Sequence, residues 1–349
     1  SLVMSVMIAL ITSIYCADIL RIMRTPENIF EGAYAYLLVT FIGVPCTFLY
    51  NLLSSIIRAL GDSKTPFWFL LFSTILNIIL DLFCILVLKW GVLGAAIATV
   101  FSQGISALLC YVYMYRHFQI LKGEAKEHKF QLHLARTLLN IGVPMGLQFS
   151  ITAIGSIMLQ SANNALGTAC VAAFTSAMRI KMFFICPFES LGIAMATYCG
   201  QNLGAGKIDR IRRGILLATG YTCIWCTLNI VTAYTIGDWL VWLVTGSKTP
   251  EVIYNATLYL KVDTLFYYVT AVICIVRNSM QGLGERIVPL ISSSLEMIGK
   301  IVIAATLVPM FGYPGVIAAE PIVWFIMIIP LLMKILRMPV WKQKNLKVS

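Results

Sequence analysis

The sequence predicts an all-α membrane protein whose helices cross the bilayer about ten times. Hydrophobic residues make up 59% of its 349 residues and charged residues only 12%, whereas ordinary soluble domains are about one quarter charged. The mean hydropathy is +0.86. Apolar runs of roughly twenty residues recur along the chain, which is the length of helix that crosses about 30 Å of hydrocarbon.

The apolar runs form two groups on either side of a polar segment at 117–137. We expect about four spans in a shortened N-terminal bundle, 1–116, and six in a C-terminal bundle, 138–338, before a basic tail at 339–349. A barrel of short alternating strands does not fit runs of this length. The expected spans lie near 1–20, 33–57, 67–88, 92–115, 140–163, 169–198, 213–236, 252–280, 287–309 and 313–336.

The net charge of +11 is explained by the orientation of these spans. When the 117–137 linker is placed in the cytoplasm, most Lys and Arg residues of the short loops and of the tail gather on that side, as the positive-inside rule requires. We therefore expect a multi-pass protein of the plasma (inner) membrane, with linker and C-terminus cytoplasmic. The charge does not call for a nucleic-acid partner.

Enzymatic signatures are missing from the spans. The sequence has no HExxH or GxSxG motif, and its three histidines all lie in the polar segment or at its edges. We therefore expect that the protein is not an enzyme and needs no organic or metal cofactor. Its main partner is expected to be the lipid bilayer.

The chain repeats itself at a nearly constant distance. "TPENI" at 25–29 returns as "TPEVI" at 249–253, "RALGDSKTP" at 58–66 as "QGLGERIVP" at 281–289, and "GVLGAAIA" at 91–98 as "GYPGVIAA" at 312–319. Six expected spans separate equivalent points, so both copies point the same way and form two pseudo-symmetric bundles. The first copy lacks counterparts of the helices at roughly 140–198, and we expect a complete molecule to have twelve spans.

Two segments resemble the multidrug and toxic compound extrusion (MATE) transporters. "RALGDSKTPF" at 58–67, followed by "LNIILD" at 76–81 and "GVLGAAIATV" at 91–100, is similar to the signature of that family's fourth to sixth helices. "GIAMATYCGQNLGAGKIDRIRR" at 192–213 is similar to the end of its eighth helix and the loop that follows. The resemblance implies a monomeric secondary antiporter that exports small organic, often cationic, compounds in exchange for Na⁺ or H⁺ by alternating access.

Asp81 is an ionisable residue within an apolar run, which marks a candidate functional site. Asn77 precedes it by one helical turn on the same face. Asp81 and Thr99 are each nine residues from Trp90 and so lie at a similar depth, roughly 13 Å below the turn. Oxygen ligands of this kind suit Na⁺, and a lone carboxylate can carry H⁺.

The resemblance implies a cation site at the same three positions, with a further carboxylate on a first helix that this chain does not contain. A second interpretation of Asp81 stays open. In it, the carboxylate is a buried structural acceptor that is hydrogen-bonded to Asn77 and Thr99.

The second copy carries different charges at the equivalent places. Asn77 corresponds to Lys300, Thr99 to Glu320, and Asp81 to an uncharged alanine. Glu296 lies one turn before Lys300 on the same helix face. We expect a buried cluster of Glu296, Lys300 and Glu320, which serves either proton coupling and recognition of a cationic substrate or only the pinning of helices.

Glu189, two residues after Pro187, is a further candidate for the lining of a substrate cavity, although a structural role at a helix bend is also open. The sequence also leaves two other functions open. A flippase for lipid-linked saccharides has a similar architecture, although the acidic residues favour cationic cargo, and a non-transporting membrane scaffold needs no ionisable residues at matched depth.

Overall fold

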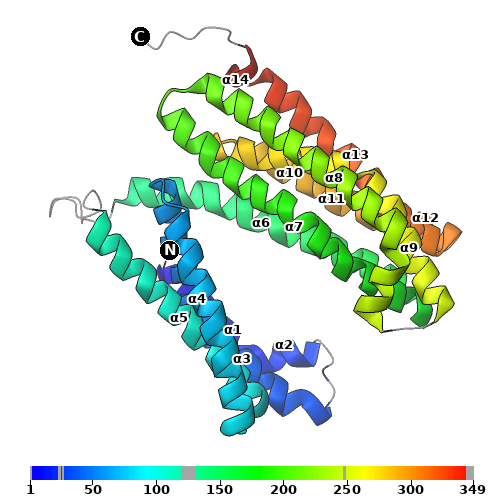
Figure 1. The fold of residues 1–349 in the computed structure, drawn as a ribbon, viewed down its shortest axis with the longest axis horizontal. Helices are drawn as coiled ribbons and strands as arrows, with labels where there is room; N and C mark the ends of the chain where they lie inside the picture. The colour runs from blue at the N-terminus through cyan, green and yellow to red at the C-terminus, as the bar shows by residue number, and fades with distance from the viewer. Residues whose placement is uncertain (1, 23–24, 26, 119–130, 247–248, 343–349) are drawn as a thin grey trace. The chain divides into compact units, whose positions relative to one another are not determined.

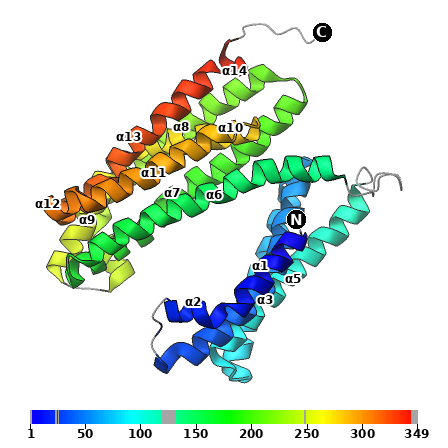
Figure 2. The same ribbon diagram turned by 180° about the vertical axis from the view of Figure 1, so that it is seen from behind.

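A computed structural model of the protein describes residues 2–22, 25, 27–118, 131–246 and 249–342 (Figures 1 and 2). All regular secondary structure within these ranges is helical, so the expected fold class is confirmed. The chain divides into two compact units, residues 1–130 and 131–349. Residues 119–130 of the expected linker and 343–349 of the expected tail lie outside the described residues.

The N-terminal unit is built around three long helices that pack side by side. Helix α3 packs along α5, with α1 on α3 and α4 on α5. The helices of this unit are α1 (Leu2–Ile14), α2 (Cys16–Ile22), α3 (Glu27–Ala59), α4 (Lys64–Leu82), the π-helical segment η1 (Phe83–Val87) and α5 (Gly91–His117).

The C-terminal unit contains the larger bundle. Helix α11 packs between α6 and α13, and α7 packs against α8, α9 and α10. Its helices are α6 (Leu132–Asn164), α7 (Thr168–Gly204), α8 (Ile208–Thr245), α9 (Pro250–Leu265), α10 (Tyr267–Gly282), α11 (Ile287–Ala305), α12 (Leu307–Phe311), α13 (Tyr313–Arg337) and α14 (Pro339–Lys342).

Most of the expected spans are long, apolar helices. Among the described residues, eight helices are long and apolar enough to cross a membrane, and a bent pair, α9 and α10, forms a ninth candidate span. The segment expected to span at 1–20 differs, because its helix breaks at Tyr15 and α1 has only 13 residues. Thirteen residues rise about 20 Å, which is less than the hydrocarbon thickness.

The span expected at 252–280 is formed by a bent pair of helices. Helices α9 and α10 meet at an angle of 56°, and the break lies at Phe266. No Gly or Pro lies at this point. The bend therefore depends on packing, and it turns the end of α9 toward α7 and α13.

The turn that precedes α4 recurs before α11. Gly61 and Gly284 have φ of 99° and 85°, in the left-handed region that favours glycine. The next residue, Asp62 or Glu285, accepts the backbone N–H two residues later, at 3.0 and 3.1 Å respectively. This turn therefore has the same construction in both units, as the sequence repeat predicts.

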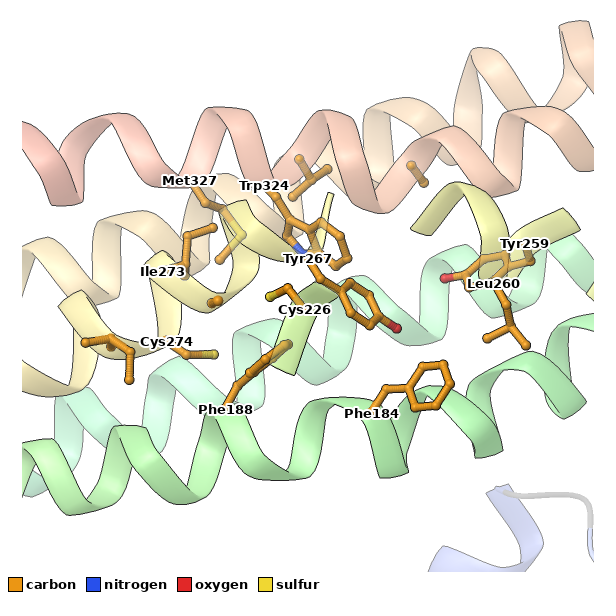
Figure 3. Packing of buried hydrophobic residues seen from close by; sticks show 14 of the residues in the cluster. Phe184, Phe188, Cys226, Tyr259, Leu260, Tyr267, Ile273, Cys274, Trp324 and Met327 are labelled. Atoms are coloured by element: carbon orange, nitrogen blue, oxygen red, sulfur yellow. The ribbon is translucent and has the colours of Figure 1, made fainter. Parts of the chain in front are cut away.

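Aromatic side chains fill the middle of the C-terminal unit (Figure 3). The ring of Tyr267 makes edge contacts with Phe188 and Trp324, at centroid distances of 5.9 and 6.0 Å. Phe188, Tyr267 and the neighbouring Cys226 are fully buried. These residues come from α7, α8, α10 and α13, so one apolar cluster joins four helices.

Helix α7 continues through Pro187, and α8 forms hydrogen bonds with it close to this point. Proline lacks an N–H and leaves the carbonyl of Phe183 without its usual donor. The next carbonyl, of Phe184, accepts the side-chain N–H groups of Trp225 at 2.9 Å and Asn229 at 3.4 Å. These bonds do not replace the donor that Phe183 lacks, but they attach α7 to α8 close to the proline.

Gly282 allows α10 to approach α7 closely. A Cβ atom at this position would overlap the backbone of Ala196, whose carbonyl carbon would lie 2.9 Å away. Because a backbone cannot turn aside as a flexible side chain can, Gly282→Ala is expected to lower the free energy of unfolding by about 1–3 kcal/mol. Thermal unfolding of the purified protein measures the loss.

Gly220→Ala in α8 is the matched control, since nothing lies within 4 Å of a Cβ atom at that position. This control is expected to match or slightly exceed the stability of the original protein, because alanine is the better helix former. Equal stability of the two variants would contradict the close approach at Gly282.

Candidate functional site

The predicted pair Asn77 and Thr99 is formed in the N-terminal unit. The Asn77 amide on α4 donates to the Thr99 hydroxyl on α5 at 3.4 Å. The Thr99 hydroxyl in turn donates to the carbonyl of Ala95, one turn earlier, at 2.9 Å. Asn77 and Thr99 are therefore neighbours on adjacent helices, whereas the residue at the same distance from Trp90 as Thr99 is Asp81.

Asp81 lies one turn beyond Asn77 and makes no hydrogen bond with Asn77 or Thr99. Its Oδ1 atom is shielded from solvent and has no hydrogen-bond partner among the described residues. The π-helical segment η1 begins two residues later, and such segments often occur at functional sites. The interpretation of Asp81 as an acceptor bonded to both neighbours does not match this geometry.

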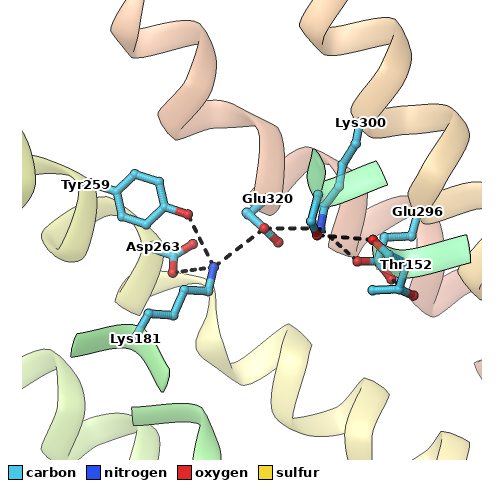
Figure 4. A network of polar contacts seen from close by, with 8 residues as sticks. Thr152, Lys181, Tyr259, Asp263, Glu296, Lys300 and Glu320 are labelled. Carbon is cyan, nitrogen blue, oxygen red and sulfur yellow. Dashed lines mark hydrogen bonds and ion pairs between the residues drawn. The ribbon is translucent and has the colours of Figure 1, made fainter. Parts of the chain in front are cut away.

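Lys300 holds the expected cluster in the C-terminal unit (Figure 4). Its Nζ atom lies 2.9 Å from Glu296 Oε1 and 3.2 Å from Glu320 Oε1. Helix α6 adds two hydroxyl groups, because Lys300 donates to Ser156 at 3.2 Å and Thr152 donates to Glu296 at 3.1 Å. The structure therefore brings all three predicted residues together on α11 and α13.

The cluster extends beyond Glu320 to a second lysine. Lys181 Nζ on α7 lies 3.8 Å from Glu320 Oε1 and 2.9 Å from Asp263 Oδ2 on α9. It also donates to the Tyr259 hydroxyl at 3.3 Å. Five ionisable side chains thus form one chain, in the order Asp263, Lys181, Glu320, Lys300, Glu296 (Figure 4). We call these five residues the charge network.

The charge network is almost completely withdrawn from solvent. The side chains of its members are between 0% and 11% exposed. Three carboxylates face two ammonium groups, so the fully ionised network carries one negative charge in excess. A buried charge without a partner costs several kcal/mol, which makes this excess the chemical feature that a proton or a cation can neutralise.

Equivalent positions of the two units make equivalent contacts. The Asn77–Thr99 pair of the N-terminal unit corresponds through the repeat to Lys300 and Glu320 of the C-terminal unit, and both pairs are in contact, at 3.4 and 3.2 Å. The framework is the same, while a neutral hydrogen bond in one unit is an ion pair in the other.

Asp263 is the member of the charge network that was not predicted, and Glu189 is a candidate that does not join it. Asp263 lies in the apolar run 252–280, so the signal that selected Asp81 was present there also. Lys181 is a cation within an expected span, for which a contact with an anionic group and a position at the membrane surface were both open interpretations. Glu189 is exposed and makes no hydrogen bond or ion pair with another described residue, so its expected role in a cavity stays a prediction.

The sequence matches known proteins over most of its length. The MatE family model matches residues 1–83 and 141–306. A probable multidrug resistance protein of Bacillus subtilis, YpnP, is 31% identical over 269 residues, which cover 77% of this chain and 60% of the relative. A second such protein of that organism, YoeA, is 29% identical over 303 residues, with coverages of 85% and 65%. The chain therefore matches about 60–65% of the length of these relatives.

The fold is also that of solved transporter structures. One is described as the outward-facing conformation of a multidrug resistance MATE family transporter of the MOP superfamily. It superposes with a TM-score of 0.90 at 22% identity, over 98% of this chain and 77% of that one. A MATE structure in a bent conformation gives a TM-score of 0.88 at the same identity, over 98% and 76%. The family model, the relatives and the fold agree, and this multi-pass membrane chain belongs to the MATE family, whose members are transporters and not enzymes.

Proposed function

We propose that this chain is the transport body of a secondary antiporter that exports small organic, often cationic, compounds in exchange for H⁺ or Na⁺. Membership of the family and the names of the relatives support export of multiple drugs. The observation that carries the coupling is the excess of one carboxylate in the charge network, at 0–11% exposure.

The arrangement of the charge network allows its charge to be neutralised in steps. Glu320 contacts both lysines, while Asp263 contacts only Lys181 and Glu296 contacts only Lys300. When Asp263 or Glu296 takes a proton, the lysine that it contacts is left with Glu320 as its charged partner. The network then has two ionised carboxylates for two lysines. Uptake and release of one proton therefore change the charged partners of one lysine, and this links charge to side-chain position.

The N-terminal unit offers a second place for the coupling ion. Asp81 presents a shielded carboxylate oxygen without a hydrogen-bond partner among the described residues, close in sequence and depth to the Asn77–Thr99 pair. A carboxylate, an amide oxygen and a hydroxyl are hard ligands that suit Na⁺, and the same carboxylate can instead bind H⁺. We propose plasma-membrane insertion with linker and C-terminus in the cytoplasm, as the distribution of Lys and Arg requires.

The proposal is tested by transport in proteoliposomes that contain the full-length protein. A Na⁺ gradient and a pH gradient are imposed separately, and the movement of ethidium is followed by its fluorescence. Ethidium movement that depends on one of the two gradients is the expected result. If neither gradient accelerates ethidium movement beyond the rate in protein-free vesicles, the result would contradict antiport.

A flippase for lipid-linked saccharides is the second candidate, because its architecture is similar. The excess of acid over base in the charge network favours a cationic cargo over an anionic one. The two candidates are distinguished by adding a lipid-linked saccharide during ethidium export. The saccharide should not slow export if the cargo is cationic. Strong competition would favour the flippase.

A further inference from the structure

The surroundings of the Lys181 ammonium differ from those of an ordinary ion pair. Besides Asp263 at 2.9 Å and the Tyr259 hydroxyl at 3.3 Å, the Nζ atom lies 4.8 Å from the ring centroid of Trp324. It is also 5.5 Å from the centroid of Tyr259. Carboxylate oxygens, a hydroxyl and aromatic faces therefore surround one positive charge.

These groups are the ones that bind alkylammonium ions in proteins. An aromatic face attracts a cation electrostatically within about 6 Å of its centroid, and most strongly when both are withdrawn from water. Tyr259 and Asp263 are fully buried, and Trp324 is 5% exposed. All three come from α9 and α13, whereas the ammonium they surround enters from α7.

The cage has acceptor capacity that Lys181 does not use, and this capacity lies mainly at Glu320. The Asp263 carboxylate is shared between Lys181, through Oδ2, and the hydroxyl of Tyr267 on α10. Glu320 lies 3.8 Å from Lys181 but 3.2 Å from Lys300. An ammonium ion that is not tied to α7 could use these oxygens more fully than the lysine does.

Lys300 provides the internal comparison. It too lies between carboxylates, at 2.9 and 3.2 Å, and it donates to Ser156. No aromatic ring of the described residues faces its ammonium. The aromatic walls are therefore particular to Lys181 and are not required merely to pair a buried lysine with acids.

We propose that α9 and α13 form an ammonium-binding cage of Tyr259, Asp263, Glu320 and Trp324, and that the chain fills it with its own Lys181 side chain. A small primary alkylammonium ion is the ligand class that fits. Because the lysine is covalently attached, an external amine cannot compete well with it in the unaltered protein. Binding in this cage does not require that the chain transports anything.

Lys181→Ala tests the cage, because it removes three carbons and the ammonium group, which together are n-propylammonium. The purified variant is expected to unfold at a lower temperature than the unaltered protein. Adding n-propylammonium is expected to raise its midpoint by about 2–4 °C, with no such response in the unaltered protein.

Four comparisons separate ammonium binding from other effects. Lys181→Met fills the space with an uncharged chain of similar length, so it should not respond to n-propylammonium. n-Propanol tests simple filling of the space, and NaCl tests a general cation effect, and neither should stabilise Lys181→Ala. Adding Trp324→Leu to Lys181→Ala should weaken the response, since it removes the ring that faces the ammonium.

A Lys181→Ala protein that responds equally to n-propanol or NaCl, or that is folded and does not respond at all, would overturn the proposal. If the variant does not accumulate, its folded yield is measured after expression with each additive. A higher yield with n-propylammonium alone supports the cage, and equal yields with all additives contradict it. Because no transport is measured, these outcomes are independent of the antiport proposed above.

Discussion

Replacement of Lys300 by Met is expected to lower the free energy of unfolding by about 3–5 kcal/mol. Lys300 is 4% exposed at its side chain and faces Glu296 at 2.9 Å and Glu320 at 3.2 Å. Methionine keeps most of the volume of the lysine stem but removes the charge. The three buried carboxylates of the charge network then have only Lys181 to compensate them, and Lys181 is already paired with Asp263 at 2.9 Å. Titration with a denaturing detergent measures the loss.

Lys334→Met is the matched control for this prediction. Lys334 pairs with Glu285 at 2.7 Å, but its side chain is 43% exposed, and exposed pairs contribute about 0–1 kcal/mol. The double variant Lys300→Met with Glu296→Gln removes the charges of both residues of the Lys300–Glu296 pair. It is expected to be more stable than Lys300→Met alone, because one fewer carboxylate is buried without a partner. A similar loss for Lys300→Met and Lys334→Met would show that burial of the network does not set its energy.

Asp81→Asn is expected to reduce gradient-driven transport to the level of protein-free vesicles. Asparagine has the same shape as aspartate but cannot ionise, so it can neither carry a proton nor balance a sodium ion. Folding should be unaffected, because Asp81 Oδ1 has no hydrogen-bond partner among the described residues that the change would remove. Ethidium movement in proteoliposomes of the full-length protein measures transport, and thermal unfolding measures stability.

Thr74→Ala is the control for Asp81→Asn. Thr74 is an exposed polar residue on the same helix whose hydroxyl bonds only the carbonyl of Leu70, one turn earlier, at 2.9 Å. Transport by this variant should match that of the unaltered protein. Full transport by Asp81→Asn would exclude the proposed coupling role, and loss of both transport and folding would assign Asp81 a structural role.

The helices and the paired positions could be predicted because lipid and duplication leave strong signals in a sequence. A spanning helix needs a long apolar run, and the repeat places Lys300 and Glu320 where Asn77 and Thr99 lie in the first copy. Helical spacing alone brings Glu296 to Lys300. Each of these predictions needs only local geometry or an offset along the chain.

The rest depends on packing that no local pattern records. No Gly or Pro at Phe266 indicates the bend in the sequence. The end of α9 before this bend brings Asp263 to 2.9 Å from Lys181 on α7. The helix break at Tyr15 likewise has no Gly or Pro that would predict it. Asp263 could have been selected as an ionisable residue in an apolar run, but its lysine partner could not have been named.

The two lysines of the charge network have an electrical consequence under the antiport that we propose. Their positive charges are attached to the chain, so they stay within the membrane whatever cargo leaves. One negative charge is left over in the fully ionised network, which matches a single monovalent ion. Exchange of one proton for one monovalent organic cation moves no net charge across the bilayer. In such an exchange the membrane potential, which acts with about 2.3 kcal/mol per elementary charge and 100 mV, neither drives nor opposes the cycle, and the ion gradient alone supplies the work.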